Sequence, residues 1–315
     1  MDGIKITGLG KCVPERVLTN EDLAQMVETN DEWIVSRTGI RTRHECTTES
    51  HEDLCLGAAK AALKDAGISP EQIGACIVAT LSADNLCPAA ACLLQRDLGL
   101  PEDIPCFDLD AACTGFLEAL HVMECLLNAS RRKFGLVVGA EALSRLVNWE
   151  DRGTCILFGD GAGAAVVECR KGWLFTDTVL GCRGDEKLLH IPGAGSLEPS
   201  LISMEGTAVF RFAVEMIPKC IEQVLSRKQV SMEEVDYFVF HQANARIIDH
   251  VMHKLHIPEE KCYKNIQEYG NTSAASIPLA LAELKELKKI GSGSRVLMVG
   301  FGGGMTWGGA LVELA

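Results

Sequence analysis

The chain alternates short apolar runs rich in β-branched residues with longer stretches in which apolar residues recur every three to four positions. Such alternation is typical of α/β proteins. Several short runs are apolar throughout, which indicates strands buried on both faces. The predicted strands are Ile4–Gly8, Ala75–Thr80, Pro105–Asp108, Phe134–Gly139, Ala164–Cys169, Tyr237–Phe240, Arg295–Val299 and Ala310–Leu314.

Capping residues and helical periodicity predict where the helices lie. Thr19 and Asp22 form a candidate capping box, and the stretch 51–66 ends at Gly67, a common residue just after a helix. Further helices are expected over Pro88–Leu98, Thr114–Asn128, Ala208–Arg227, Asn244–Leu255 and Ser273–Leu287.

Domain organisation is only weakly marked in the sequence. There is no short internal repeat and no low-complexity linker. The best candidate for a domain boundary is "CRKGWLF", where a glycine-rich segment ends and a new strand is expected to begin. We therefore predict two halves, residues 1–172 and 173–315.

Composition narrows the class of protein. The 315 residues are 47% hydrophobic, enough for a substantial core, and the formal net charge of −13 argues against nucleic acid as a partner. No apolar run reaches the roughly 18 residues of a membrane span. The fourteen cysteines sit singly, and the start of the chain lacks the pattern of a secretory signal. These features predict free thiols and a cytoplasmic location.

Two glycine-rich stretches resemble phosphate-binding loops. "GLGKCVP" has Val13 where the third glycine of a dinucleotide motif belongs, so we interpret it as a turn at a strand end. "FGDGAGAAVVE" continues as an apolar strand, without the lysine and helix that a phosphate loop needs, and indicates close backbone packing instead.

The segment "HECTTESHEDLC" contains histidine and cysteine at spacings that match no common zinc pattern, and the chain has no C-x-x-C. We interpret it as a loop leading into a helix. No metal site is predicted.

Three polar residues stand where predicted strands give way to helices or turns, the usual place for α/β sites. Cys113 would lie at a helix N-terminus, which favours thiolate and lowers the thiol pKa. His241 ends the run "YFVF", and Asn271 lies in the turn "EYGNTS", where Ser273 could cap the following helix.

Taken singly, these residues have ordinary explanations: a packed cysteine, a structural histidine and a turn. Together they predict covalent thioester chemistry, with a thiolate nucleophile and two hydrogen-bond donors for developing negative charge. A cysteine protease would also need Cys113 and His241, but it gives no reason for "GFGGGMTWGGALV", whose glycines let a backbone N–H approach a reacting oxygen.

The chain resembles the β-ketoacyl-acyl carrier protein synthase III family of thiolase-superfamily ketosynthases almost from end to end. The matching segments are "DEWIVSRTGIRTR", "DLDAACTGF", "DRGTCILFGDGAGAAVV", "HQANARII", "YGNTSAASIPLAL" and "GFGGGMTWGGALV". The resemblance implies an α/β thiolase-like fold of five layers, αβαβα, built from two similar halves, and a homodimer.

The resemblance also implies a reaction that initiates fatty acid synthesis. Cys113 takes an acyl group from acyl-CoA, and decarboxylative condensation with malonyl-acyl carrier protein then gives a 3-ketoacyl product. His241 and Asn271 would stabilise the enolate, and the N–H groups of Cys113 and Gly303 would form the oxyanion hole. Phe301 would lie beside the malonyl carboxylate, where an apolar ring favours loss of charge. No metal or redox cofactor is implied, and acyl-CoA is a substrate.

The same resemblance implies two binding surfaces. Trp33, Arg37 and Arg152 would hold the CoA nucleotide by stacking and phosphate neutralisation. A basic patch would meet the acidic carrier protein through Arg246, Arg211 and Lys254, although Asp249 lies on the same predicted helix.

Starter choice depends on the acyl pocket, in which the family implies a role for Cys87. Its small side chain favours branched or medium-chain starters over very short ones. Two alternatives remain at this point: a related ketosynthase of secondary metabolism with a different starter or acceptor, and a catalytically silent scaffold that keeps only the fold.

Overall fold

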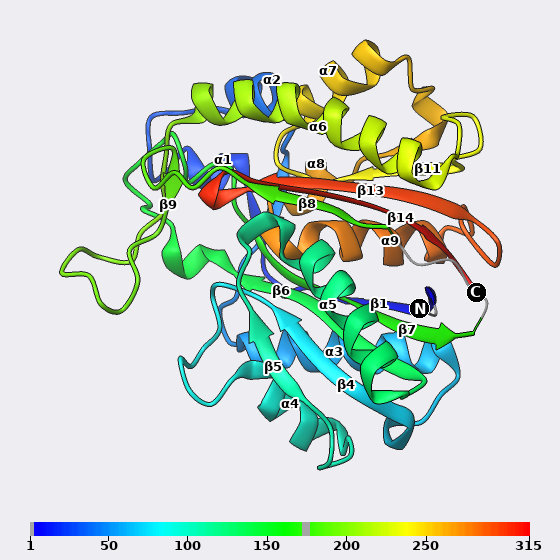
Figure 1. Cartoon of the computed structure of the whole chain (residues 1–315). Coiled ribbons are helices and arrows are strands. Elements are labelled where there is room, and N and C mark those ends of the chain that lie inside the picture. The colour runs from blue at the N-terminus through cyan, green and yellow to red at the C-terminus, as the bar shows by residue number, and fades with distance from the viewer. Residues whose placement is uncertain (1–2, 172–176) are drawn as a thin grey trace.

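A computed structural model describes residues 3–171 and 177–315 and shows five layers (Figure 1). The first sheet has the order β1 (Gly3–Cys12), β7 (Asp160–Arg170), β6 (Phe134–Ala142), β4 (Ile73–Ala79) and β5 (Cys106–Leu109). The second has the order β8 (Val179–Cys182), β14 (Thr306–Glu313), β13 (Arg295–Gly302), β11 (Tyr237–Phe240) and β12 (Cys262–Tyr263). The predicted αβαβα fold is confirmed.

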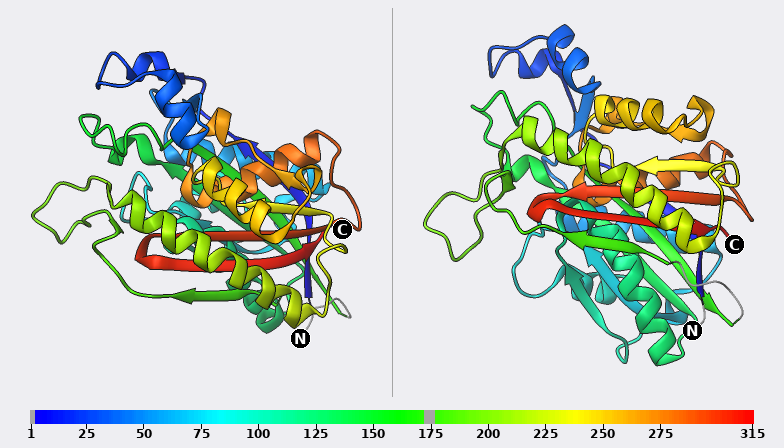
Figure 2. Two further views of the ribbon diagram at one scale, coloured as in Figure 1. Left: turned by 90° about the horizontal axis from the view of Figure 1, so that it is seen from above. Right: turned by 45° about the horizontal axis from the view of Figure 1, so that its top comes forward.

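Helices cover both sheets and fill the space between them. α3 (His51–Ala66) and α4 (Ala90–Leu98) pack on the outer face of the first sheet, and α6 (Gly206–Lys228) and α7 (Ala245–Leu255) cover the second. In both views of Figure 2, the yellow-green helix α6 lies across the red strands β13 and β14 of the second sheet. α5 (Gly115–Ser130) and α9 (Ser276–Glu286) lie between the sheets.

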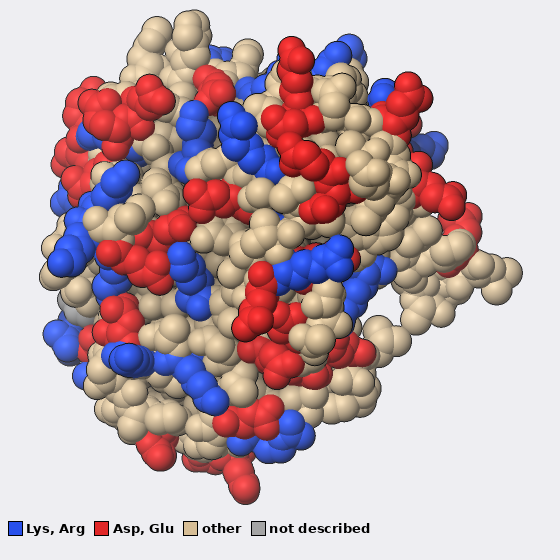
Figure 3. Space-filling view, turned by 180° about the vertical axis from the view of Figure 1, so that it is seen from behind, with Lys and Arg blue, Asp and Glu red and all other residues tan. Residues whose placement is uncertain are grey.

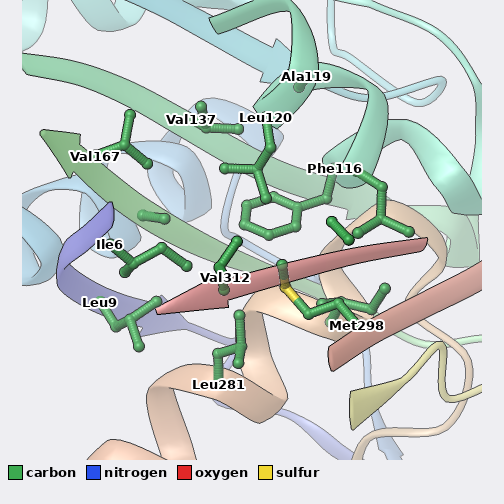
Figure 4. Packing of buried hydrophobic residues seen from close by; sticks show 14 of the residues in the cluster. Ile6, Leu9, Phe116, Ala119, Leu120, Val137, Val167, Leu281, Met298 and Val312 are labelled. Atoms are coloured by element: carbon green, nitrogen blue, oxygen red, sulfur yellow. The ribbon is translucent and has the colours of Figure 1, made fainter. Parts of the chain in front are cut away.

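The central layer holds an apolar core that joins the two halves. In Figure 4, Phe116 of α5 and Leu281 of α9 lie among side chains of both sheets, including Val137 and Met298. These residues are almost fully inaccessible to water. Burial on this scale, at about 25 cal/mol per Å² of apolar surface, holds the two sheets in a fixed relation, and with them the loops at their ends.

The two halves repeat one topology that the sequence does not reveal. In chain order, β1, β4, β5, β6 and β7 correspond to β8, β11, β12, β13 and β14, and each set takes up the same positions in its sheet. In each sheet four strands run in one direction, and one strand, β7 in the first sheet and β14 in the second, is antiparallel to both of its neighbours. The loop after β5 therefore has its counterpart after β12. The predicted boundary between residues 172 and 173 lies outside the described residues.

All eight predicted strands and the predicted helices are present; β11 and α3 have the predicted bounds, and most of the others have shifted ends. The helix α2 (Asp31–Thr38) was not predicted; it is short, begins after the Asn30 cap and is followed by Gly39 as its C-cap. Also not predicted were β8 and several short elements: β2 (Val17–Thr19), β3 (Thr42–His44), β9 (Leu189–His190), β10 (Ser203–Met204), β12 and α8 (Ile266–Tyr269). The predicted capping box is confirmed at α1 (Asn20–Leu23).

The interpretation of "GLGKCVP" as a strand-end turn is wrong. β1 continues through Gly8 and Gly10, where a Cβ would lie 2.3 Å from the carbonyl oxygens of Ala62 and Ala58 in α3. Glycine is required there because the strand and helix backbones touch. Close backbone packing is confirmed for the other glycine-rich stretch, since a Cβ on Gly163 would lie 2.5 Å from the backbone nitrogen of Leu279 in α9.

Every one of the fourteen cysteines lies in the described part of the chain and has a free thiol. Within residues 3–171 and 177–315, no helix combines the length and apolar character needed to cross a bilayer. Acidic and basic side chains are interspersed on the face in Figure 3, without a broad basic area. The cytoplasmic location stays a prediction.

Candidate active site

Cys113 lies in a tight turn between β5 and α5, at the edge where the strands of the first sheet end. The turn spans Ala112–Thr114, and Ala112 has a left-handed backbone with φ of 47°. Backbone strain of this kind is stored at functional sites because surrounding packing over-determines it. The loop after β12 repeats the feature, with Ser273 at φ 46°.

The expectation that a helix N-terminus lowers the pKa of Cys113 is wrong for this structure. Cys113 is only 7% exposed, and burial raises the pKa of its thiol to about 12, although the hydroxyl of Ser273 acts in the opposite direction. Desolvation outweighs the helix dipole here because the charged thiolate would lose its water. The nucleophile is therefore a thiol at rest and needs a proton acceptor.

His241 follows β11 and is buried. Its backbone N–H donates to the carbonyl of Val299, and its ring Nδ1 lies 2.7 Å from the Ser276 hydroxyl. Burial lowers the pKa of His241 to about 3, which keeps the ring neutral. The ring of Phe301 meets it edge-on, with centroids 5.5 Å apart. A neutral imidazole in this position can donate a hydrogen bond without carrying charge.

Asn271 is fixed by its backbone and by its own side chain. Its N–H donates to the Leu157 carbonyl at 2.8 Å, and its carbonyl accepts from the Gly159 N–H at 3.0 Å. The side-chain Oδ1 accepts from the Ser273 N–H at 2.9 Å. Because the oxygen is engaged, the Nδ2 amide is the group that can donate to a ligand.

The end of β13, which belongs to the second half of the chain, packs directly against Cys113. A Cβ on Gly302 would lie 2.8 Å from both the backbone nitrogen and the Cβ of Cys113. Only glycine allows this approach, which carries Gly303 to the turn around Ala112. The predicted pair of N–H donors, Cys113 and Gly303, thus belongs to two neighbouring turns.

Two hollows meet at Cys113. The first has a volume of about 640 Å³ and brings together most of the predicted residues, namely Cys113, His241, Asn271, Phe301, Trp33, Arg37, Arg211 and Arg246. The second has a volume of about 960 Å³ and carries leucine and isoleucine side chains, among them Leu81, Leu143 and Ile202. A group held on Cys113 can therefore extend into the second hollow while the first stays open to a second reactant.

Trp33 projects from α2 at the first hollow, and two arginines lie close to its ring. The guanidinium carbon of Arg152 lies 4.5 Å from the centre of the indole ring, and that of Arg37 lies 5.8 Å from it. Arg152 also donates to the carbonyl of Glu28 at 2.9 Å. A flat ring flanked by two exposed cations suits a planar anionic ligand such as a nucleotide.

The predicted basic patch is divided between α6 and α7. Arg246 and Arg211 are exposed and line the first hollow, and the Arg246 guanidinium lies 5.9 Å from the ring centre of Phe210. Lys254 is exposed on the last turn of α7 and does not line that hollow. Asp249, expected to weaken the patch, is paired with Lys264 at 2.7 Å.

Cys87 is exposed and does not line either hollow within the single chain. Its neighbour Leu86 does line the second, apolar hollow while remaining 89% exposed. The role of Cys87 in the acyl pocket stays a prediction.

Ser276 and Glu141 were not predicted as site residues, and the predicted role of Ser273 as a helix cap is wrong. Ser273 does not cap α9, which begins at Ser276 without a side-chain cap. Ser276 instead meets His241, and Glu141 is a carboxyl buried in the first sheet. A glutamate within the apolar run "LVVGAEAL" was the available signal, since a buried carboxyl is rare without a partner.

Comparison with known proteins gives one consistent result. The family model for 3-oxoacyl-[acyl-carrier-protein] synthase III matches residues 107–184, and the model for its C-terminal part matches 225–314. A β-ketoacyl-[acyl-carrier-protein] synthase III of Natranaerobius thermophilus is 46% identical over 99% of this chain and 100% of that protein. The one of Clostridium acetobutylicum is 42% identical over 99% of both.

A solved structure agrees with these sequence comparisons. The crystal structure of 3-oxoacyl-[acyl-carrier-protein] synthase III from Aquifex aeolicus superimposes with a TM-score of 0.93 at 43% identity, covering 99% of this chain and 100% of that one. The similarity therefore extends over both halves and over all the loops that meet at Cys113.

Proposed function

Because the chain belongs to the 3-oxoacyl-[acyl-carrier-protein] synthase III family, we propose that it catalyses the condensation that initiates fatty acid synthesis. Its substrates are acyl-CoA and malonyl-acyl carrier protein. The observation that carries the proposal is the meeting of two hollows at Cys113, one with two hydrogen-bond donors and one apolar.

In the first half-reaction the Cys113 sulfur attacks the thioester carbonyl of acyl-CoA. The new C–S bond forms as the bond to the CoA sulfur breaks, and CoA leaves as a thiol. The N–H groups of Cys113 and Gly303 stabilise the oxyanion of the tetrahedral intermediate. Trp33, Arg37 and Arg152 hold the CoA nucleotide at the mouth of the first hollow, and the acyl chain occupies the second.

In the second half-reaction malonyl-acyl carrier protein enters the first hollow after CoA has left. Loss of carbon dioxide leaves an enolate, whose oxygen accepts hydrogen bonds from His241 and Asn271. Phe301 presents an apolar ring to the carboxylate, which favours its loss as a neutral gas. The enolate carbon then attacks the acyl thioester on Cys113, and as the C–S bond breaks the 3-ketoacyl product forms and Cys113 leaves as a thiolate, which takes up a proton to restore the resting thiol.

The carrier protein docks on the face formed by Arg246, Arg211 and Lys254. Both arginines line the hollow that leads to Cys113, so a carrier held there would present its thioester to the nucleophile. Opposite charges also speed encounter.

The working unit is a homodimer. β5 is the last strand of its sheet, so its outer edge has unpaired backbone groups that a second copy could use. Leu86, exposed beside the apolar hollow, would be covered by such a contact. Light scattering coupled to size-exclusion chromatography would give twice the 34.0 kDa chain mass, and a single chain mass would contradict the dimer.

Intact-protein mass spectrometry tests the function. The chain is mixed with acetyl-, isobutyryl-, isovaleryl- and octanoyl-CoA, with Cys113→Ser as the control. A mass increase of one acyl group that is absent in the control identifies the nucleophile, and the preferred donor names the starter. If no acyl-CoA adds mass to Cys113, initiation from acyl-CoA is contradicted.

A further inference from the structure

Glu141 lies near the end of β6, fully buried, on the side that faces the loop carrying Ser273. Gly139 lies on the same face of the strand because side chains alternate. A Cβ on Gly139 would come within 2.3 Å of the Ala274 carbonyl oxygen, so this face of β6 touches the loop directly. Packing thus places the Glu141 carboxyl beside Ser273 and, beyond it, Cys113.

One oxygen of the carboxyl is engaged and the other is open. Oε2 accepts from the Thr80 hydroxyl and the Leu81 N–H, each at 3.3 Å, and it also contacts the Ser82 hydroxyl. Oε1 is buried and has no hydrogen-bond partner among the described residues. The Ser82 hydroxyl and the Leu81 amide fix the carboxyl and leave Oε1 as its free acceptor.

Ser273 stands between this carboxyl and the nucleophile. Its hydroxyl is buried and has no formed hydrogen bond within the described ranges, yet it lowers the pKa of both the Cys113 thiol and the Glu141 carboxyl. The turn that carries Ser273 packs against the start of α5, since a Cβ on Gly115 would lie 3.4 Å from the Cβ of Ala274, and Ser273 and Cys113 both line the second hollow. Together with the contact to β6, this packing places the hydroxyl near both groups. A serine hydroxyl can accept a proton on one side while it donates on the other.

The other titratable groups near Glu141 either have hydrogen-bond partners of their own or act on the carboxyl only through their charge. His51 of α3 shares the Thr80 hydroxyl at 2.9 Å and bonds the Ala140 carbonyl. Asp160 of β7 holds Ser144 and the Cys46 N–H. Asp110, in the loop before Cys113, raises the pKa of both the thiol and the Glu141 carboxyl by its charge.

Among the described residues that line the first hollow, His241 is the only histidine, and its Nδ1 is occupied by the Ser276 hydroxyl. A buried thiol needs a base, and His241 is a neutral donor whose pKa lies near 3. Burial raises the pKa of Glu141 to about 7, so its carboxyl can exchange a proton near neutral pH.

We propose that Glu141 is a positioning residue that accepts the proton of Cys113 through the hydroxyl of Ser273. The Ser273 hydroxyl gives its hydrogen to Oε1 and takes the thiol hydrogen as the sulfur bonds to the acyl carbon. When the bond to the CoA sulfur breaks, the proton returns along the same path to the leaving thiolate. The sum is Cys113 thiol plus acyl-CoA giving acyl-Cys113 plus CoA thiol.

This inference rests on the proposed function for its place in the reaction, but its test needs no acyl-CoA. The rate of Cys113 alkylation by iodoacetamide is measured by peptide mass spectrometry from pH 5 to 9.5. In the unaltered chain the rate should rise and level near pH 7, where the carboxyl becomes an acceptor. Glu141→Gln and Ser273→Ala should lose that inflection and react at least about tenfold more slowly at pH 7.

Glu141→Asp, which keeps a carboxyl, should restore part of the inflection. The matched control is Glu124→Gln, which removes another fully buried carboxyl. Glu124 lies nine residues after the start of α5 and therefore away from Cys113, which precedes that helix. This variant should leave the profile unchanged. Circular dichroism melting confirms that each variant is folded, and Ser273→Ala provides the answer if Glu141→Gln does not fold.

Faster alkylation of Glu141→Gln at pH 7 would show that the carboxyl merely repels the thiolate, and an unchanged inflection would show that it takes no part. Either result overturns the inference. Failure of the unaltered chain to accept an acyl group from acyl-CoA would instead contradict the proposed function, so the two failures are distinguishable.

Discussion

His241 and Ser276 are hydrogen-bonded, with 2.7 Å between the ring Nδ1 and the hydroxyl oxygen. The Ser276 oxygen also accepts from the Gln242 N–H at 3.4 Å, so its own hydrogen is available to the ring. A ring that accepts at Nδ1 carries its proton at Nε2. Ser276, the first residue of α9, thus leaves the Nε2 N–H of the imidazole as the hydrogen-bond donor of the ring.

Replacing Ser276 by Ala should weaken this tautomer preference. The loss of one hydrogen bond, about 1 kcal/mol, predicts a fall of about fivefold in malonyl decarboxylation. Carbon dioxide release from malonyl-acyl carrier protein measures this step. Ser130→Ala, an exposed serine at the end of α5, is the control and should have no effect. Undiminished release by Ser276→Ala would mean that the hydroxyl does not set the tautomer.

Asn271→Ala should separate the two half-reactions. Acyl transfer to Cys113 should remain largely intact, whereas decarboxylation should fall at least about a hundredfold because the enolate loses a preorganised donor. His241→Ala should act in the same direction. Acyl transfer is followed by intact mass and decarboxylation by carbon dioxide release. An equal loss of both steps would contradict the proposed division of roles.

Gly302→Ala should disturb the contact between the two halves at the nucleophile. The new Cβ would lie 2.8 Å from the Cys113 nitrogen, and relieving that clash should cost about 1–3 kcal/mol of unfolding free energy. Thermal melting measures the loss, and acylation should slow as the turns move apart. Gly291→Ala is the matched control, since nothing lies within 4 Å of its Cβ position.

Trp33→Ala should weaken acyl-CoA binding without impairing chemistry on Cys113. Loss of the stack with Arg152 predicts a KM for acyl-CoA about tenfold higher and an unchanged kcat. A short acyl thioester of N-acetylcysteamine, which lacks the nucleotide, should be used equally well by the variant and the unaltered chain. Lys60→Ala, an exposed cation on α3, should change neither value. A variant defect of equal size with both thioesters would contradict the nucleotide site.

His241 also predicts a dependence of stability on pH. The ring takes up a proton near pH 6.5 in the unfolded chain but only near pH 3 in the folded one. Between these values the unfolded state binds more protons, so the free energy of unfolding falls as the pH falls. The melting temperature of His241→Gln relative to the unaltered chain should therefore rise from pH 7 to pH 4. A constant difference would mean that His241 titrates normally.

Much of the fold follows from local pattern. Apolar runs such as "LVVGA" in β6 and the capped stretch at α3 specify their own secondary structure, because neighbouring residues set both burial and caps. The segment containing α2 was not recognised, since it is only eight residues long and has two buried side chains. The internal repeat could not be detected in the sequence, because the two halves share the order of their strands and not a recognisable pattern of residues.

Local runs and motifs are enough to predict the secondary structure of the core and the family, and they single out Cys113, His241 and Asn271 as candidate site residues. The protonation of the site, in contrast, depends on contacts between segments that are far apart in the chain. A helix N-terminus favours thiolate, but burial of Cys113 among side chains from both halves reverses that preference. Desolvation depends on everything that surrounds a group, as do the contacts of Ser276 and Glu141, and residues distant in the chain supply those surroundings.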